Sequence, residues 1–306
     1  MKVLKSQVLA DVSASGKSRN WALHKLNSGY ISLAYADVDP KKGERMKDCA
    51  NWLSFVRDEG GRLKLHDARF CRVRLCPICQ WRRSLKTYAQ MSQVLGLAAA
   101  DGYQFLFLTL TARNCDGLEL SGDLTRLLQG FNRLTKYKEV KAVVKGYYRG
   151  CEVTHNTRTD EYHPHLHVIL AVKSSYFAGK YYITQERWSE LWQRALQVDY
   201  KPIVDIRKCK GGYKSIAEAC KYAVKPSDII NYDDWEMTVE TLRVLDKALE
   251  NRRFVGLGGI IKDLHKSLHL DDIEDGDLVH IEGQSEGEAT PEEIIYFWNG
   301  YNQYTL

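Results

Sequence analysis

The sequence of 306 residues lacks any run of about 20 consecutive apolar residues, so it predicts no transmembrane helix. The apolar stretch near its N-terminus is too short for the core of a signal peptide, and we therefore expect a cytoplasmic protein without a membrane partner. Proline is scarce, with 6 residues, while 44% of the residues are hydrophobic and 27% are charged. This composition excludes a disordered or low-complexity chain and allows a large buried core.

Basic residues are absent from the C-terminal part of the chain. Residues 271–306 contain 10 acidic residues and no Lys or Arg, which leaves 44 basic and 29 acidic residues before them, a net charge of +15. A basic body with an acidic tail favours a polyanionic partner, above all a nucleic acid. Ordinary solubilising charge would give the same composition, so charge alone leaves both interpretations open.

Eight cysteines without a secretory signal indicate metal binding or buried thiols rather than a disulfide framework. Cys71, Cys76 and Cys79 fall within nine residues, which is a spacing typical of zinc-binding loops. The fourth ligand could be Cys49 or His66, and we prefer Cys49 because four thiolates make a closed structural zinc site. The alternative is a group of buried free thiols.

The cysteine-rich segment is also strongly basic. Residues 69–86 contain no acidic residue, and a zinc-braced loop with many cationic side chains suits contacts with DNA phosphates. The basic residues of this run are Arg69, Arg72, Arg74, Arg82, Arg83 and Lys86.

The middle of the chain alternates between strand and helix patterns. Short apolar segments rich in β-branched and aromatic residues predict strands at 105–111, 146–154, 162–172 and 203–207. Helical periodicity predicts helices at 85–100, 124–134, 188–196, 215–225 and 233–251. Residues 1–45 have no clear pattern. This order predicts an α+β fold with a largely antiparallel central sheet and flanking helices.

Three of the nine histidines lie within residues 163–167, which read His-Pro-His-Leu-His. On a strand, His165 and His167 point to the same face and Leu166 points to the opposite, buried face. Two imidazoles on one face are a good start for a divalent metal site, which Glu152 on the preceding strand could complete. The alternative is a group of surface histidines beside a turn.

The segment SIAEACKYAVKPSD at 215–228 carries a second candidate site. On a helix, Glu218 and Tyr222 lie one turn apart on the same face, and Lys225 follows Tyr222 by three residues. A tyrosine can attack a phosphodiester, a nearby ammonium can neutralise the phosphate, and a carboxylate can activate water. Alternatively, Ser215 and Glu218 form only a capping box, and Tyr222 is structural.

Taken together and in this order, these motifs resemble the rolling-circle replication initiators of small bacterial plasmids, which belong to the HUH endonuclease superfamily. The resemblance extends from about Trp21 to about Lys262 and is absent from the acidic tail. The segments that carry it are RFCRVRLCPICQWRRSLK at 69–86 with Cys49 upstream, FLTLTARN at 107–114, CEVTHN at 151–156, YHPHLHVIL at 162–170 and EACKYAVK at 218–225.

The resemblance implies an HUH endonuclease-like fold whose central strands carry the histidines. It implies that His165 and His167 bind a catalytic Mg²⁺ or Mn²⁺, with Glu152 or His163 as the third ligand. Together with the cysteine motif, it also implies a structural Zn²⁺ in an N-terminal module.

The resemblance further implies that Tyr222 is the nucleophile and forms a 5′-phosphotyrosyl intermediate with single-stranded origin DNA. Lys225 would position the scissile phosphate. Glu218 would activate water for the terminating cleavage, in agreement with a class that uses a single tyrosine.

We accordingly expect three regions in the chain. Residues 1–86 would hold the zinc module and the DNA-binding run, with Arg72, Arg74, Arg82, Arg83 and Lys86 as DNA contacts. Residues 87–232 would form the nicking and joining domain, and residues 233–306 a C-terminal helical region with the acidic tail. No phosphate-binding loop of the Walker type is present, so helicase and polymerase would be host partners.

Three other functions remain open on the sequence alone. A relaxase or single-strand transposase of the HUH type would share the histidine and tyrosine motifs. A zinc-containing DNA-binding regulator would bind DNA without nicking it. A metal-dependent hydrolase of small molecules would need further His or Asp ligands in later strands. The acidic tail could restrain non-specific DNA binding or inactivate the protein after one round of replication.

Overall fold

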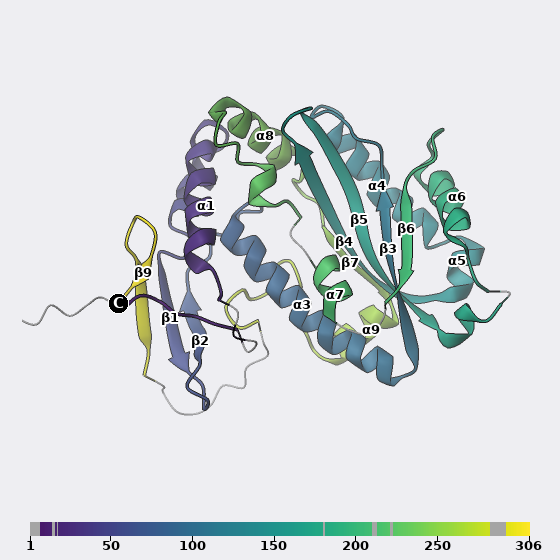
Figure 1. Ribbon diagram of the computed structural model, residues 1–306, viewed down its shortest axis with the longest axis horizontal. Coiled ribbons are helices and arrows are strands. Elements are labelled where there is room, and N and C mark those ends of the chain that lie inside the picture. The colour runs from purple at the N-terminus through teal and green to yellow at the C-terminus, as the bar shows by residue number, and fades with distance from the viewer. Residues whose placement is uncertain are drawn as a thin grey trace, which may run out of the picture.

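The protein has an α+β fold built on two antiparallel sheets, with one long helix, α3 (Pro77–Ala100), running between them (Figure 1). This computed structural model describes residues 7–13, 16, 18–179, 181–209, 213–220, 223–281 and 292–306, and only the backbone of residues 213–215. The expected fold class, an antiparallel central sheet with flanking helices, is confirmed. None of the helices in these ranges is long and apolar enough to cross a membrane.

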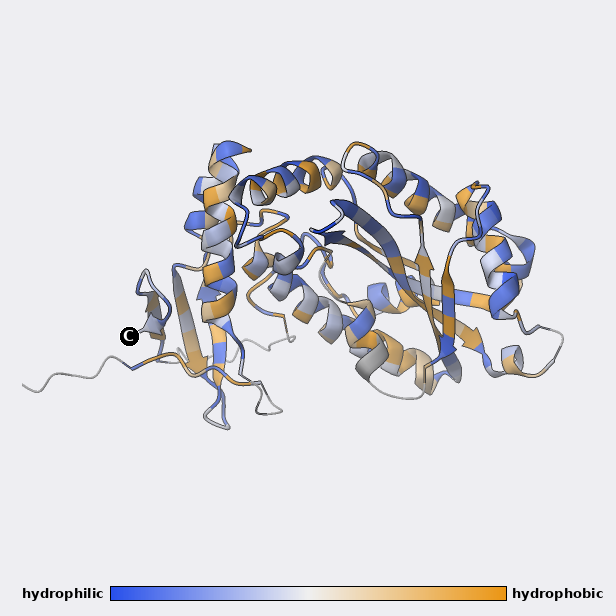
Figure 2. Ribbon diagram, turned by 45° about the horizontal axis from the view of Figure 1, so that its top comes forward, coloured by the Kyte–Doolittle hydropathy of each residue, from blue (hydrophilic) through white to orange (hydrophobic). Residues whose placement is uncertain are grey.

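The larger sheet has the strand order β6-β3-β5-β4-β7, and every neighbouring pair is antiparallel. Each predicted strand of the middle region is present, and β7 is an additional one. The strands are β3 (Tyr103–Thr111), β4 (Val144–Asn156), β5 (Glu161–Lys173), β6 (Val204–Lys208) and β7 (Val255–Gly259). Strands β4 and β5 form the expected hairpin, whose free end is hydrophilic while its middle is apolar (Figure 2).

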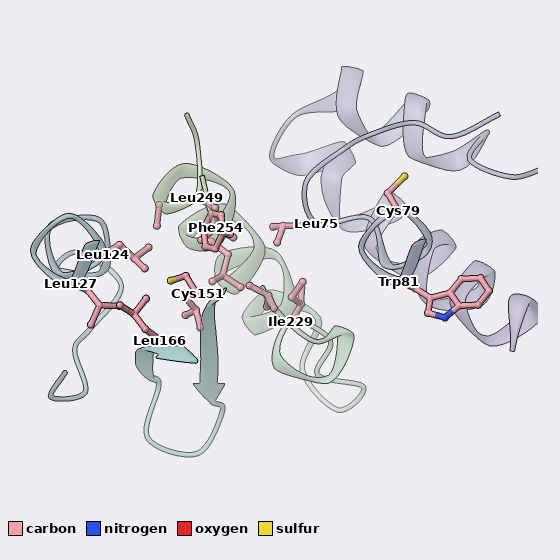
Figure 3. Packing of buried hydrophobic residues seen from close by; sticks show 14 of the residues in the cluster. Leu75, Cys79, Trp81, Leu124, Leu127, Cys151, Leu166, Ile229, Leu249 and Phe254 are labelled. Carbon is pink, nitrogen blue, oxygen red and sulfur yellow. The ribbon is translucent and has the colours of Figure 1, made fainter. Parts of the chain in front are cut away.

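Helices cover both faces of this sheet. On one face, Leu166 and other even-numbered residues of β5 pack in a core with α4 (Leu120–Leu134) and α6 (Gln185–Leu196) (Figure 3). On the other face, Ile169 and Ala171 pack against α3, α7 (Tyr213–Ala219) and α9 (Ile260–Ser267). The odd-numbered histidines of β5 therefore lie on the second face, beyond the apolar contacts of these helices.

The smaller sheet, of order β2-β1-β8-β9, joins the two ends of the chain. Strands β1 (Trp52–Arg57) and β2 (Leu63–Ala68) come from the N-terminal region, whereas β8 (Ile294–Trp298) and β9 (Tyr304–Thr305) come from the acidic tail. Buried Tyr296 and Tyr304 explain this pairing, because they place large aromatic rings in the core beneath β1. Residues 233–306 thus contribute strands to both sheets as well as helices.

The helices differ from the prediction at several places, and α5 (Lys138–Val143) and α9 were not predicted. The unpatterned N-terminal region contains α1 (Trp21–Ala34) and α2 (Pro40–Lys47), and α3 begins at Pro77 rather than near residue 85, with Cys76 as its N-cap. Helix α7 ends at Ala219 rather than before Pro226. The remaining helices are α8 (Trp235–Ala248) and the short 3₁₀ turns Tyr35–Asp37, Ser174–Phe177 and Pro226–Asp228.

Candidate functional site

Three side chains of the β4–β5 hairpin converge on one face of the larger sheet. Glu152 of β4 lies directly opposite His165 of β5, and His167 lies two residues further along the same strand. Their potential ligand atoms all lie within 4.8 Å of one another. The strand period of two therefore places both imidazoles and the carboxylate together, as the sequence predicted.

The geometry of this group fits a cation. Nε2 of His165 and Nε2 of His167 lie 3.3 Å and 3.1 Å from the same carboxylate oxygen, Oε2 of Glu152. Nδ1 of His165 lies 3.1 Å from the carbonyl oxygen of His163, which can only accept a hydrogen bond, so Nδ1 carries the hydrogen. In the neutral ring, the lone pair of Nε2 then faces a carboxylate. A proton or a metal ion between them balances this arrangement.

His163 does not join this group. Its Nδ1 lies 2.8 Å from Oδ1 of Asn114, and its ring stacks on that of His165 at 5.2 Å. Of the two candidates for a third ligand, the described geometry favours Glu152 over His163. Burial lowers the pKa of His163, and the neighbouring His165 adds to this effect.

Lys225 lies beside the same carboxylate. Its Nζ is 2.8 Å from Oε1 of Glu152, the oxygen that the histidines do not contact. Burial opposes ionisation of Glu152, but the hydrogen bonds from His165, His167 and Lys225 outweigh it and hold the pKa of the carboxyl well below its usual range. Burial also opposes the charge on Lys225, yet its hydrogen bond with Glu152 raises its pKa, so the ammonium keeps its charge.

The tyrosine segment is placed by the end of α7. Glu218 lies on this helix, whereas Tyr222 lies outside the described residues. Helix α7 ends at Ala219, and beyond it the carbonyl of Ala223 accepts a hydrogen bond from the backbone N–H of Val153 on β4, at 2.8 Å. This bond draws the chain after α7 toward the strand that carries Glu152.

A glycine on β4 allows this close approach. A Cβ atom at Gly150 would lie 2.6 Å from the carbonyl oxygen of Ala219, the last residue of α7. The hydroxyl of Tyr148 donates a hydrogen bond to the same carbonyl at 3.2 Å. The end of α7 is thus fixed against the strand, three residues before the motif tyrosine in the sequence.

The four predicted cysteine ligands form a second group. The Sγ atoms of Cys49, Cys71, Cys76 and Cys79 all lie within 4.8 Å, and the contacts Cys49–Cys79, Cys71–Cys79 and Cys76–Cys49 each measure 3.7 Å. Sulfur atoms at the corners of a tetrahedron around zinc, with Zn–S bonds of about 2.3 Å, are about 3.8 Å apart. The buried cluster therefore matches the dimensions of a closed structural zinc site.

Polar contacts around the sulfurs support metal binding. The backbone N–H of Cys71 donates to Sγ of Cys49 at 3.4 Å, and that of Arg72 donates to Sγ of Cys79 at 3.3 Å. Such contacts stabilise negative charge on thiolates. His66, the alternative fourth ligand, instead faces Glu293 at 3.6 Å on the smaller sheet. The described geometry thus places Cys49, and not His66, with the other three cysteines.

The basic run after the cysteines is covered by the acidic tail. Arg82 and Lys86 are buried, with exposed fractions of 1% and 2%. Residues 271–279, which we call the acidic segment, supply acceptors to every predicted DNA contact. The pairs are Arg72 with the carbonyls of Asp275 and Gly276, Arg74 with Glu274, Arg82 with the carbonyls of Leu278 and Val279, Arg83 with the carbonyl of Glu274, and Lys86 with Asp271 and the carbonyl of Asp272.

Some residues around these groups were not singled out from the sequence. Thr109 faces His167, with Oγ1 3.5 Å from Nδ1, and its place opposite His167 follows the same alternation that pairs β3 with β5. Ser28 lies 3.3 Å from Sγ of Cys76 and belongs to a helix without a clear apolar pattern. The alternation could have identified Thr109, but no local signal points to Ser28.

Comparison with known proteins agrees with the geometry. A family model described as "Replication protein" matches residues 62–305. The chain is 41% identical to "Protein rep" of Bacillus amyloliquefaciens over 98% of its own length and 97% of that protein. It is 39% identical to "Protein rep" of Streptococcus pneumoniae serotype 2, over 97% of the chain and 94% of that protein. No solved structure matches the chain.

Proposed function

This chain belongs to the family of replication proteins, and from that premise we propose that it initiates rolling-circle replication of a plasmid by nicking and rejoining one DNA strand at the origin. The observation that carries the proposal is the convergence of Glu152, His165 and His167 beside Lys225, next to the segment that contains Tyr222. A sequence-specific nick needs these three elements: a cation site, a phosphate-binding ammonium and a nucleophile.

In this proposal, Glu152, His165 and His167 hold a divalent ion, Mg²⁺ or Mn²⁺, at the end of the β4–β5 hairpin. When bound, the ion polarises the scissile phosphate. Two imidazoles and one carboxylate leave the other coordination positions open for a phosphate oxygen and water. A bound ion would also offset the charge of Glu152, which would leave the ammonium of Lys225 free to bind the phosphate.

Tyr222 supplies the nucleophile. Its hydroxyl oxygen forms a bond to phosphorus, the bond from phosphorus to the 3′ oxygen breaks, and the leaving oxygen takes up a proton to become a free 3′-OH. The products are a primer end and a 5′-phosphotyrosyl protein. One phosphodiester is exchanged for another, so the reaction needs no external energy source and is readily reversed, which permits rejoining.

Glu218 then acts in termination. As a general base it takes a proton from water, whose oxygen attacks the scissile phosphate of the regenerated origin while the bond from phosphorus to the 3′ oxygen breaks. The new 3′-OH then attacks the phosphotyrosyl phosphorus, which releases the Tyr222 oxygen and closes the displaced strand. The zinc module would orient the N-terminal half of the protein on the origin DNA, and host helicase and polymerase would extend the primer. The finer roles of His163 and of the basic run remain predictions.

A covalent-adduct assay tests the proposal. Full-length protein is mixed with Mn²⁺ and single-stranded DNA from its own replicon, denatured and mapped by mass spectrometry. We expect a DNA-linked peptide that contains Tyr222. The adduct should disappear with Tyr222→Phe, with the double substitution His165→Ala and His167→Ala, and with a chelator. It should persist with Tyr232→Phe, a matched control at an exposed tyrosine.

The Glu218→Gln variant separates the two steps. It should form the adduct at a normal rate and accumulate it, because water is no longer activated. Binding of the replicon DNA without any adduct in the wild-type protein would reject the nicking mechanism and favour a DNA-binding regulator.

A further inference from the structure

The acidic segment contains a carboxylate, Glu274, that is bound by backbone N–H groups and lies near two guanidinium groups. Glu274 is 7% exposed, and its Oε1 accepts hydrogen bonds from two successive backbone N–H groups, those of Phe254 at 2.6 Å and Val255 at 3.0 Å. The guanidinium groups of Arg74 and Arg253 lie 3.9 Å and 3.7 Å from the same carboxylate. Two adjacent amides flanked by two guanidinium groups are the donor arrangement that binds a phosphate.

The rest of the acidic segment follows a row of cations. Asp272 pairs with Arg253 at 2.7 Å, and Asp271 pairs with buried Lys86. Arg72 and Arg82 donate to backbone carbonyls further along. The acidic segment thus presents a row of carboxylate and carbonyl oxygens to a row of basic side chains. A DNA backbone presents its phosphate oxygens to a basic surface in the same way.

The position of this surface points to DNA rather than another polyanion. A small cavity of about 60 Å³ lies beside Glu274, and its lining includes Arg74 and Arg83. The lining also includes Cys220 and Ala223, the residues on either side of the pair that includes the motif tyrosine. A strand bound along the basic row would therefore lead to the nucleophile.

We propose that the acidic segment is an internal mimic of the DNA backbone, and that origin DNA displaces it and places a phosphate where the Glu274 carboxylate lies. This inference rests on the proposed function. It assigns the five predicted DNA contacts two successive partners, first the acidic segment and then the phosphates. Apolar anchors, Ile273 and Leu278, hold the segment in place in the free protein, so non-specific DNA has to compete with it.

Hydrogen exchange measures the displacement directly. Full-length protein is followed by mass spectrometry with and without a saturating mixed-sequence single-stranded oligonucleotide. We expect peptides covering 271–281 to exchange faster with DNA, while peptides of β3 remain unchanged. The same measurement is made with single-stranded DNA from the protein's own replicon, and unchanged or slower exchange in the acidic segment with that DNA bound would show a permanent structural element and overturn the inference.

A substitution gives a second, independent readout. Glu274→Gln keeps the shape and the acceptor oxygen but removes the charge, and it should tighten oligonucleotide binding by roughly three- to tenfold. Asp263→Asn, which makes the same charge change on exposed α9, should leave the affinity unchanged. Equal or weaker binding by Glu274→Gln would contradict the mimic. If Glu274→Gln binds no more tightly but the Tyr222 adduct still forms, only the displacement of the acidic segment is rejected. If the wild-type protein binds no DNA at all, the nicking function is rejected as well.

Discussion

At the scale of single residues, Glu152 is a buried side chain whose charge depends on close partners. It is a buried carboxylate that contacts two imidazoles through one oxygen and an ammonium through the other. Its charge is compensated only while these partners or a metal ion surround it. The residue therefore links the metal site to the lysine that would receive the phosphate.

Glu152→Gln should weaken Mn²⁺ binding by at least roughly tenfold, because the site loses the carboxylate that joins the two imidazoles. Calorimetric titration of the full-length protein with Mn²⁺ measures the loss. Glu139→Gln, which removes an exposed carboxylate paired with Arg187, is the control and should bind as the wild type does. Equal affinity in both variants would exclude Glu152 as a ligand.

His265 makes a pH-dependent contribution to stability. Burial lowers its pKa from 6.5, and the opposing effect of Asp271 and Asp272 is weaker. The unfolded chain therefore binds more protons than the folded one below pH 6.5, so the free energy of unfolding falls as the pH drops through this region.

His265→Gln should remove part of this acid sensitivity, because glutamine can keep a hydrogen bond to Gln90 without titrating. The measurement is the thermal midpoint at about pH 7.5 and about pH 5.5, where the variant should lose less stability than the wild type. His269→Asn, at an exposed position after α9, serves as the control. Identical pH profiles for His265→Gln and the wild type would refute the assignment.

At the scale of elements, the contact between β4 and α7 controls where the tyrosine segment begins. Gly150→Ala would place a Cβ against the carbonyl of Ala219, so the end of α7 must move. We expect a loss of about 1–3 kcal/mol in the free energy of unfolding and slower adduct formation. Gly122→Ala in α4, where a Cβ meets nothing within 4 Å, should be neutral or stabilising. Chemical denaturation of both variants distinguishes a local clash from a general effect of the methyl group.

Much of the larger sheet could be predicted at this scale. Short apolar segments rich in β-branched and aromatic residues identified β3, β4, β5 and β6, and the strand period of two placed His165 and His167 on one face. The end of helix α7 was harder to predict. The chain that follows it is held by a hydrogen bond between Ala223 and Val153, two residues that are far apart in the sequence. The start of α3 was missed because Arg82 and Arg83 interrupt the apolar pattern, and their burial depends on acceptors from residues 274–279.

At the scale of the whole molecule, the two ends of the chain complete one sheet. Tyr304 is buried and donates a hydrogen bond to the carbonyl of Ala50 at 2.7 Å, and Tyr296 lies opposite Leu53. The sequence alone identified residues 271–306 only as an acidic tail, because acidic residues dominate its composition. The strands within it become evident only through their partners in the N-terminal region.

A chain ending at residue 281 should therefore be less stable by about 3–6 kcal/mol, since two tyrosine rings leave the core. It should also associate, because the edge of β1 loses its partner. Thermal unfolding and light scattering measure the two effects. Tyr304→Phe, which keeps the ring and loses only the hydroxyl, should cost about 1 kcal/mol. A truncated protein as stable and monomeric as the full chain would contradict the structural role of β8 and β9.

The pairing of β1 with β8 also sets an order of events during synthesis. While β8 and β9 are still being synthesised, strand β1 of the smaller sheet has an unpaired edge. The basic side chains of α3 also lack most of their hydrogen-bond acceptors at that stage. Long-range pairings of this kind form late in folding. A nascent chain thus passes through a state with an unpaired sheet edge and an uncovered basic helix, and a chain that stops before the acidic segment remains in it. The sheet edge is paired and the basic helix is covered only after these last segments have been synthesised. The amount of correctly folded protein therefore depends on the number of completed chains and not on the number of chains that were begun.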